Sequence, residues 1–383
     1  MKLKIKRGDI INGLQKAASI IPLKAPSVSL RSIWLKAEKD RISIMTTDAD
    51  MEFTGIYPAE VEQEGLVGVL GRSFADLIAK WPAGDINISL DESSQTLRLE
   101  QGRRNYKLPV SSVEWFQPFA AWPEGPNAIW TGDFLSAILE KVNFCIDDDD
   151  ARDAMATLCM KPVADGRIDA CGLNGHQFAM FSFINDELAS MFSENGLMIQ
   201  KKYLGDLKKW LAPGEIELNL TEKRLFLRQL DGAEILSIPR YVRNAFPDYN
   251  LFLSKLEGGG VARLSVSRKA AIEALSRIMV FMTDTNRCVY MDLGEGELRM
   301  IAQGADNGSG RETLEADYSG DMDRIAFPTR ELLEIFNHFE SEYIDMHFTG
   351  QEGPCGITGP DDPSYTVVIM PMRVTDFDGL KPF

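Results

Sequence analysis

The sequence predicts an α+β protein built from three copies of one unit of roughly 125 to 130 residues, with helices on one side of antiparallel sheets. The segments after Trp81 and after Trp210 both run from a helix that ends in Trp, through a Pro/Gly break, into two short alternating strands. A third and looser copy follows residues 329–339. At 383 residues the chain is also too long for one ordinary core. The boundaries that fit the repeat give domains at 1–125, 126–252 and 253–374 and an extra tail at 375–383.

Each unit is expected to contain a pair of helices, because apolar residues recur there with the helical period of about 3.6 residues. Several of these segments begin with Thr or Ser ahead of the apolar run, which is favourable N-cap chemistry. The first helices of the pairs are expected at 7–19, 131–143 and 267–278, and the second helices at 72–81, 201–211 and 329–339.

Short runs in which apolar and polar residues alternate lie between these helices. They are bounded by turn residues, and they predict antiparallel strands with one packed face. The clearest runs are 2–6, 41–48, 167–173, 178–183, 234–239, 297–303 and 365–371.

Positive charge is concentrated on the predicted helices. The six segments carry thirteen basic and eight acidic side chains, whereas the whole chain has a formal net charge of −16. The segment 201–211 shows the pattern most clearly, because four lysines share one arc of the helix and five apolar residues share the opposite arc. One lysine stripe is an ordinary solvated face, but a basic layer over several helices of an acidic protein indicates a surface for nucleic acid.

The composition limits the class of protein. A hydrophobic content of 44% and a charged content of 26% are typical of a folded soluble chain. No apolar run approaches the roughly 20 residues of a membrane span, and residues 1–11 contain no apolar signal core, so we expect a cytoplasmic protein without a membrane partner. The five cysteines are odd in number and widely spaced, which predicts buried thiols rather than a disulfide framework or a zinc site.

No catalytic constellation is evident in the sequence. Motifs of the types G-x-x-x-x-G-K-[ST], H-E-x-x-H and G-x-S-x-G do not occur. The run Asp147–Asp150 leaves two weaker alternatives open, an acidic hydrolase and a Mg²⁺ site, although contiguous aspartates usually form a solvated loop. A repeat-built scaffold that never touches DNA is a third alternative, and the basic helical layer argues against it. We expect no catalysis, no cofactor and no metal.

Three phrases then identify a resemblance. Residues 172–183 resemble an Asp-Gly-His-Arg-Leu segment, residues 244–253 contain Phe-Pro-Asp-Tyr, and residues 365–374 resemble a terminal Val-Met-Pro-Met-Arg strand. In this order and spacing they resemble the β subunit of bacterial DNA polymerase III, the sliding clamp family. The resemblance covers residues 1–374.

The resemblance implies a head-to-tail homodimer, closed into a ring of six similar domains around duplex DNA. The basic helices would line the hole, where attraction to phosphates carries no base information and therefore permits sliding. The implied partners are the polymerase III catalytic subunit, the clamp loader and other proteins with a clamp-binding motif, in the cytoplasm at the nucleoid. The bases expected near DNA are Lys24, Arg72, Lys80, Lys201, Lys202, Lys208, Lys209, Arg268 and Arg277.

The resemblance also implies an apolar pocket between the second and third domains that binds short peptide motifs of these partners. Methionine and aliphatic side chains suit such an adaptable groove. Val368 and Met370 could equally belong to the core, because alternate residues of a strand point to opposite faces. The implied lining is Met155, Leu173, Gly175, His176, Gln177 and Phe178 of the second domain, Pro247, Leu251 and Phe252 of the connector, and Val368, Ile369, Met370, Pro371, Met372 and Arg373 of the last strand.

Three features depart from the family pattern. The run Asp147–Asp150 would repel phosphate, so we do not expect this loop to contact DNA. Gln177, Leu173 and Leu251 stand where the family has arginine, threonine and arginine, so the pocket should be more apolar and less positive. The tail 375–383 lies beyond the usual end of the family, and the spacing of its apolar residues suggests that it occupies a pocket on its own or a neighbouring molecule. A surface-packed terminus is the alternative.

A dimer interface is implied at two places. Tyr106 is expected on an edge strand of the first domain, and Val280 and Phe281 are expected opposite it. The run 277–282 is apolar enough for the core of an interface, but it could equally pack within the chain.

Overall fold

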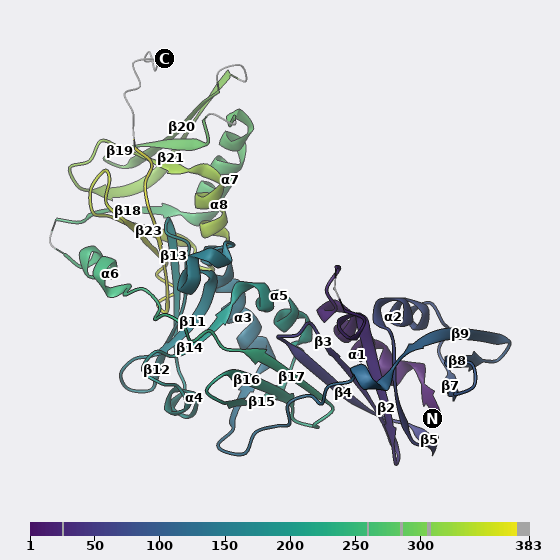
Figure 1. Ribbon diagram of the computed structural model, residues 1–383. Helices are drawn as coiled ribbons and strands as arrows, with labels where there is room; N and C mark the ends of the chain where they lie inside the picture. The colour runs from purple at the N-terminus through teal and green to yellow at the C-terminus, as the bar shows by residue number, and fades with distance from the viewer. Residues whose placement is uncertain (25–26, 259, 284–285, 305–307, 374–383) are drawn as a thin grey trace. The chain divides into compact units, whose positions relative to one another are not determined.

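The computed structural model describes residues 1–24, 27–258, 260–283, 286–304 and 308–373. The chain divides into two compact units (Figure 1). The first unit consists of Met1–Ala137 and Lys202–Val242, and the second consists of Ile138–Lys201 and Arg243–Phe383. The tail 375–383, for which the sequence suggests a pocket, lies outside the described residues.

A single thirteen-stranded sheet runs through the first unit, in the order β10-β15-β16-β17-β4-β3-β2-β6-β9-β8-β7-β1-β5. All of its strand pairs are antiparallel. The strands are β1 (Lys2–Lys6), β2 (Ser32–Glu38), β3 (Arg41–Thr47), β4 (Glu52–Pro58), β5 (Glu60–Gln63), β6 (Gly65–Leu70), β7 (Asp85–Asp91), β8 (Thr96–Gln101), β9 (Arg104–Ser111), β10 (Ala128–Thr131), β15 (Glu215–Leu220), β16 (Arg224–Gln229) and β17 (Glu234–Pro239).

The second unit contains a twelve-stranded sheet in the order β14-β11-β12-β13-β25-β24-β23-β18-β21-β20-β19-β22. It is antiparallel as well, so both sheets have the type that the alternating runs predict. The strands are β11 (Thr157–Pro162), β12 (Arg167–Leu173), β13 (Gln177–Ile184), β14 (Leu197–Gln200), β18 (Ala262–Ser267), β19 (Cys288–Gly294), β20 (Glu297–Gly304), β21 (Gly308–Ser319), β22 (Arg324–Pro328), β23 (Tyr343–Phe348), β24 (Cys355–Thr358) and β25 (Tyr365–Ile369).

One strand order occurs three times, which confirms the three copies. The first four-stranded half of each copy reads β4-β3-β2-β6, β13-β12-β11-β14 and β21-β20-β19-β22. The second half reads β9-β8-β7-β1, β17-β16-β15-β10 and β25-β24-β23-β18. Halves of different copies join edge to edge through β17 with β4 and through β13 with β25. The exact boundaries 1–125, 126–252 and 253–374 stay a prediction.

The six expected helices are all present, within three residues of the expected ends. They are α1 (Arg7–Ile20), α2 (Gly71–Ala79), α3 (Gly132–Val142), α5 (Lys201–Trp210), α7 (Arg268–Ile278) and α8 (Thr329–Asn337), and two short helices, α4 (Asp186–Met191) and α6 (Asn250–Leu256), were not expected. Helices α1 and α2 contact each other, and so do α7 and α8, which lie side by side against their sheet (Figure 1). None of the helices in the described ranges is long and apolar enough to cross a bilayer.

Burial of the cysteines follows the expectation from the sequence. Four of the five thiols are buried, and Cys288 is half-buried. Burial raises the pKa of Cys159 to about 12, because the thiolate would lose its hydration in the sheet. These thiols are therefore inert packing groups at neutral pH.

The half-buried carboxylate of Asp362 connects helix α3 to the last copy. Its Oδ2 atom accepts hydrogen bonds from the backbone N–H groups of Glu340 and Ser341, both at 2.8 Å, and from the Ser341 hydroxyl at 2.9 Å. The ammonium of Lys141 on α3 lies 3.7 Å from Oδ1, and it donates to the carbonyl of His338. Burial opposes ionisation of Asp362, but these donors and the lysine charge outweigh it and lower the pKa of the carboxyl.

Removing this charge is expected to destabilise the second unit at neutral pH only. The lowered pKa means that the stabilisation is complete above the ordinary value of 3.8 and is lost as the pH falls below it, through the lower pKa of the folded protein. Asp362→Asn should therefore lower the free energy of unfolding by about 2 kcal/mol at pH 7, and the difference from the natural protein should shrink toward pH 3. Urea unfolding at both pH values measures this. Glu340→Gln, at a side chain 85% exposed, is the control without an effect, and an Asp362→Asn gap that is equal at both pH values would contradict the account.

Candidate functional site

Helix α5 presents the lysine stripe that the sequence predicts, with one exception. Tyr203, Leu204, Leu207 and Trp210 are buried, and Lys202, Lys208 and Lys209 are exposed. Lys201 is half-buried instead. Its ammonium donates to the carbonyl of Ile146 at 2.6 Å and pairs with Asp148 at 2.7 Å. Lys201 is thus less accessible than the other three lysines, because it holds the loop of Asp147–Asp150, and its role near DNA stays a prediction.

The other basic residues expected near DNA are also mostly exposed. Lys24, Arg72, Lys80 and Arg277 are on the surface, and Arg268 is half-buried. Two arginines bind backbone carbonyls, Arg72 that of Ile21 and Arg268 that of Ser341. Arg277 forms a two-point ion pair with Glu312, at 2.8 and 3.0 Å. Surface pairs of this kind contribute little to stability, so their charges remain available to a polyanion.

The expected pocket residues of the second unit come together where β12, β13 and β25 lie side by side. Leu173 pairs with Phe178 across β12 and β13, and Phe178 pairs with Val368 across β13 and β25. Beyond the end of β25, the N–H of Met370 donates to the carbonyl of His176 at 2.9 Å. The Phe252 ring of α6 meets the Phe178 ring edge-on, with centroids 4.9 Å apart. Segments more than 190 residues apart thus form one surface.

The exposed fractions of the side chains distinguish the residues that line the groove from those that lie beneath it. Among the residues expected to line the pocket, Gln177, Phe178, Val368 and Ile369 are at most 6% exposed, so they form the buried base rather than the accessible lining. This corrects the expectation for those four, and for Val368 it favours the core. Leu251, Met370 and Met372 are exposed by 70%, 37% and 45%. The accessible lining is completed by Gly175, His176, Pro247 and Arg373, and Met155, Leu173, Phe252 and Pro371 are half-buried.

Two polar residues that sequence reasoning missed hold the groove in place. The Asp169 side chain is 2% exposed and accepts hydrogen bonds from Ser182 at 2.7 Å and from the Tyr249 hydroxyl at 3.0 Å. Tyr249 precedes α6 and stacks on Phe178 with ring centroids 5.4 Å apart. Burial, followed by the neighbouring thiols and the Asp169 charge, raises the pKa of Tyr249. The signal for Tyr249 was present, because it is the last residue of the phrase Phe-Pro-Asp-Tyr.

Gln177 is held in one orientation by its neighbour. The Oδ1 atom of Asn174 accepts the N–H groups of His176 and Gln177, at 3.0 and 2.8 Å, so its amide nitrogen must be the atom that donates to Oε1 of Gln177. The Nε2 atom of Gln177 is then a buried donor without an acceptor among the described residues. A buried donor without an acceptor lowers the stability of the folded protein. This donor lies in the base of the groove.

The acidic loop forms a small cavity beside the groove. Phe144, Asp147, Asp149, Arg152 and His176 are among the residues that line a space of about 330 Å³. Asp147 lies 3.5 Å from the Arg152 guanidinium. Within the described residues no three His, Cys, Asp or Glu side chains are arranged to hold a metal ion.

Besides the end strands β5, β10, β14 and β22 of the two sheets, β9 and β21 each have one edge that is paired over only part of its described length. Residues 104–109 of β9 pair with β8, and only 110–111 reach β6 on the other side. Residues 308–315 of β21 pair with β20, and only 316–319 reach β18. Tyr106, 43% exposed, lies in the open part of β9. Val280, 72% exposed, and Phe281 line a space of about 420 Å³ together with Gly310 and Glu312 of β21. The residues expected at a dimer interface thus adjoin these open edges.

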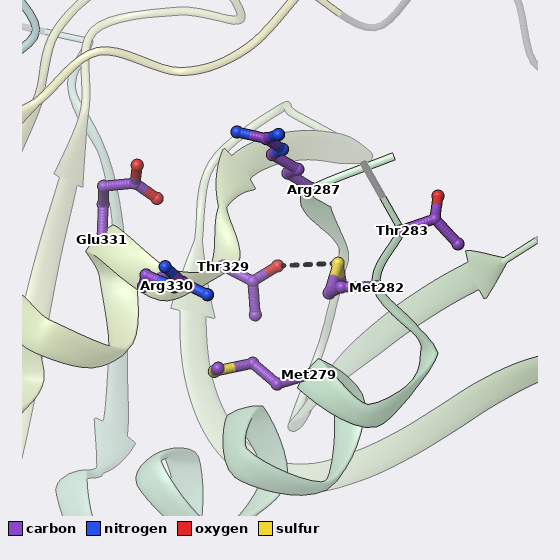
Figure 2. Close-up of a pocket in the computed structure, with 7 residues that line it drawn as sticks. All are labelled: Met279, Met282, Thr283, Arg287, Thr329, Arg330 and Glu331. Atoms are coloured by element: carbon purple, nitrogen blue, oxygen red, sulfur yellow. Dashed lines mark hydrogen bonds between the residues drawn. The ribbon is translucent and has the colours of Figure 1, made fainter. Parts of the chain in front are cut away.

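A larger cavity lies within the second unit, between the short helix η5 (Met279–Phe281) with its following loop and the start of α8. Its volume is about 630 Å³. Figure 2 shows Thr329 between Met279 and Met282, with Arg330 on the α8 side and Arg287 on the other rim. The Thr329 hydroxyl, on a residue 1% exposed, is 3.5 Å from the Met282 sulfur, which is a weak acceptor. Sequence reasoning gave no sign of this cavity.

Comparison with known proteins matches the two ends of the chain to models of one family. Residues 1–119 match the model described as DNA polymerase III beta subunit, N-terminal domain, and residues 260–373 match the model for the C-terminal domain of the same subunit. Together these matches cover more than half of the chain.

Full-length relatives are similar over the whole chain. A beta sliding clamp of Caulobacter vibrioides is 23% identical over 378 residues, and one of Streptomyces coelicolor is 24% identical over 391, each match covering 98% of this chain and all of the relative. Among solved structures, pol III beta of Caulobacter crescentus superposes with a TM-score of 0.89 at 23% identity, and the Bartonella birtlesii sliding clamp bound to griselimycin with 0.89 at 22%, again over 98% of this chain and all of the other.

Proposed function

This chain belongs to the DNA polymerase III beta subunit family, the beta sliding clamps, and we propose that two copies of it close head to tail into a ring around duplex DNA. Members of the family are non-catalytic processivity factors, so the alternatives of an acidic hydrolase and of a scaffold without DNA are set aside. The proposal covers the ring, the DNA-facing helices, the peptide groove and the partners of this protein.

The ring is inferred chiefly from the partly unpaired edges of strands β9 and β21. In the strand orders given above, the first-named strand of a first half pairs with the first-named strand of a second half twice, as β4 with β17 and as β13 with β25. The strands left over in the same pattern are β21 and β9. A second copy would complete the pattern, because β21 of each chain can add to β9 of the other. Two such contacts are enough for closure into six similar domains.

Charge and exposure support this pairing. The β9 edge carries Arg104 and Lys107, with Arg103 just before it, and the open part of β21 carries Glu312 and Glu315 besides Arg311. Residues 104–107 are exposed on both faces of the strand, which is unusual for a paired strand and is typical of one that lacks its neighbour. Val280 and Phe281 would supply the apolar part of the contact.

The DNA surface of the ring would be its helical layer. Lys202, Lys208 and Lys209 are exposed on α5, and the acid is concentrated on strands and loops, so phosphates are attracted to the helices and repelled elsewhere. The Asp147–Asp149 side of the acidic loop, which neutralises Lys201, would stay away from the phosphates. Retention would come from closure of the ring and not from tight contacts.

Circular DNA tests the clamp directly. After loading by the clamp loader of the same cell, the protein should remain with a nicked circle through gel filtration and should be lost once the circle is cut. The variant Lys202→Glu/Lys208→Glu/Lys209→Glu should leave about tenfold fewer clamps on each circle, because six charges per ring change sign. The matched control is Lys2→Glu/Lys39→Glu/Lys223→Glu, which changes exposed lysines outside the helices and away from the groove. Equal retention on linear and circular DNA would rule out a closed ring.

The groove of Leu251, Met370 and Met372 would receive the apolar motifs of the polymerase III catalytic subunit, the clamp loader and other clamp-binding proteins, in the cytoplasm at the nucleoid. Exposed methionine and leucine side chains next to buried aromatic rings can bury an aliphatic or aromatic anchor of such a peptide. The replacement of the family's arginines by Gln177 and Leu251, and of its threonine by Leu173, favours neutral, apolar motifs.

Leu251→Asp is expected to weaken the binding of an apolar clamp-binding peptide at least about tenfold, since a charge would have to be desolvated at the anchor. Stability should not change, because the Leu251 side chain is 70% exposed. Fluorescence anisotropy with a labelled peptide measures the affinity. Ile184→Asp, at a side chain 76% exposed on the same sheet, is the matched control. If both variants bind like the natural protein, the groove is not the peptide site.

A further inference from the structure

The cavity between η5 and α8 has a chemistry that selects its occupant. Met279 and Met282 give it an apolar, polarisable lining, and the exposed arginines Arg287 and Arg330 stand on its rim (Figure 2). Thr329 adds a buried hydroxyl whose hydrogen-bond partner among the described residues is the thioether of Met282. Methionine sulfur packs well on aromatic rings, and guanidinium groups bind carboxylates with short charge-assisted hydrogen bonds. Glu331 also lines the cavity, but the two arginines outnumber this one carboxylate. The cavity therefore fits an aromatic side chain flanked by carboxylates.

The last described residues of the chain lie close to the strand that ends at this cavity. After β25, the N–H of Met372 donates to the carbonyl of Ala326 at 2.8 Å, so the strand end lies along β22. Strand β22 runs directly into Thr329 at the cavity. Three residues of extended chain, from Ala326 to Thr329, span about 10 Å, and the nine residues of the tail span up to about 30 Å. The tail can therefore reach the cavity of its own chain.

The sequence of the tail is Thr-Asp-Phe-Asp-Gly-Leu-Lys-Pro-Phe, in which Asp376 and Asp378 flank Phe377. We propose that residues 375–383 dock in this cavity of their own chain, with the Phe377 ring against Met279 and Met282 and the two carboxylates on Arg287 and Arg330. The inference goes beyond the proposed clamp function and does not depend on it. The groove of Leu251, Met370 and Met372 is the competing place, and Arg152, beside Gly175 of its lining, and Arg373 adjoin it.

Site-specific photo-crosslinking tests the docking in the full chain. A benzophenone amino acid replaces Phe377, the protein is irradiated, and crosslinked peptides are identified by mass spectrometry. A mixture of isotopically heavy and light protein distinguishes links within one chain from links between copies. The expected result is links within one chain to residues 279–283 or 329–331. Links to Leu251, Met370 or Met372, links between copies, or links scattered over the surface would each overturn the proposal.

Charge variants measure the part played by the arginines. Arg330→Glu is expected to lower the yield of these links at least about threefold, because it replaces an attraction by a repulsion next to the carboxylates. Adding Asp378→Lys to Arg330→Glu should restore part of the yield. Arg299→Glu, at an exposed arginine on β20 of the same unit, is the control that should leave the yield unchanged. A yield that does not respond to Arg330→Glu, or responds equally to Arg299→Glu, would refute the pairing, and thermal unfolding of each variant verifies that it is folded.

Discussion

Reversing the charge of the β9 edge with Arg104→Glu and Lys107→Glu is expected to split the ring into single chains and to abolish retention on circular DNA. The open part of β9 would face Glu312 and Glu315 of the partner in the proposed pairing, so each of the two contacts gains like charges and loses attraction. The effect is doubled, because both contacts of the ring carry both substitutions. Light-scattering mass should fall from twice 42.8 kDa to 42.8 kDa at micromolar protein.

Reversing the charge of the β21 edge as well should restore the dimer, which makes the test specific to the contact between β9 and β21. A chain that also carries Glu312→Arg and Glu315→Arg should dimerise again, since the two edges then attract with exchanged signs. The control Arg41→Glu/Lys223→Glu changes two exposed bases of the same unit away from β9 and should remain a dimer. If the β9 variant keeps its mass, or if the fourfold variant does not recover, β9 does not pair with β21.

Glu234→Ala is expected to lower the stability of the first unit by about 3 to 5 kcal/mol, the usual cost of leaving a buried charge unpaired. Glu234 is 5% exposed, and its carboxylate lies 2.6 Å from the Lys16 ammonium and 2.9 Å from the Tyr57 hydroxyl. The pair connects helix α1 of the first copy to β17 of the second copy. Burial, and then the Glu234 charge, raise the pKa of Tyr57, so its hydroxyl remains a donor at all ordinary pH values.

Urea unfolding followed by tryptophan fluorescence measures this loss, because the Trp210 ring lies 5.9 Å from the Lys16 ammonium. Glu62→Ala removes a comparable ion pair with Lys2 whose side chains are 64% and 59% exposed, and it should cost less than about 1 kcal/mol. The double variant Lys16→Met/Glu234→Leu should recover most of the loss, since no charge remains buried. A Glu234→Ala variant as stable as Glu62→Ala would show that the cluster does not hold the copies together.

The local pattern of apolar and polar residues predicts the helices and strands of this protein well. Helix α5 shows which features this pattern cannot predict. The helical period places its apolar face and its exposed lysines, because both depend on residues within ten positions. The half-buried state of Lys201 depends instead on a carbonyl 55 residues earlier, which no local pattern contains. The short helices α4 and α6 were missed for a related reason, since six or seven residues are too few to show a clear period.

The candidate groove could be located only through the resemblance. Strands β13 and β25 are far apart in the sequence, and their pairing brings Gln177, Phe178 and the last strand together. The phrases mark which segments meet, but they do not tell which side chains are buried, because β25 lies inside the sheet with both faces covered. The role of Asp169 could not be predicted, because nothing in the sequence marks a single aspartate in a strand as functional. Its role becomes visible only in the folded chain, where Ser182 and Tyr249 donate hydrogen bonds to it.

Small-angle scattering with light-scattering mass, on the protein alone, tests the central claim most directly. The account predicts a mass of twice 42.8 kDa and a distance distribution with the broad, shifted maximum of a hollow ring. A ring of two copies covers both partly open edges, because β9 of each copy then pairs with β21 of the other. A stable monomer at micromolar concentration, or a dimer with the distribution of a compact solid particle, would contradict the account.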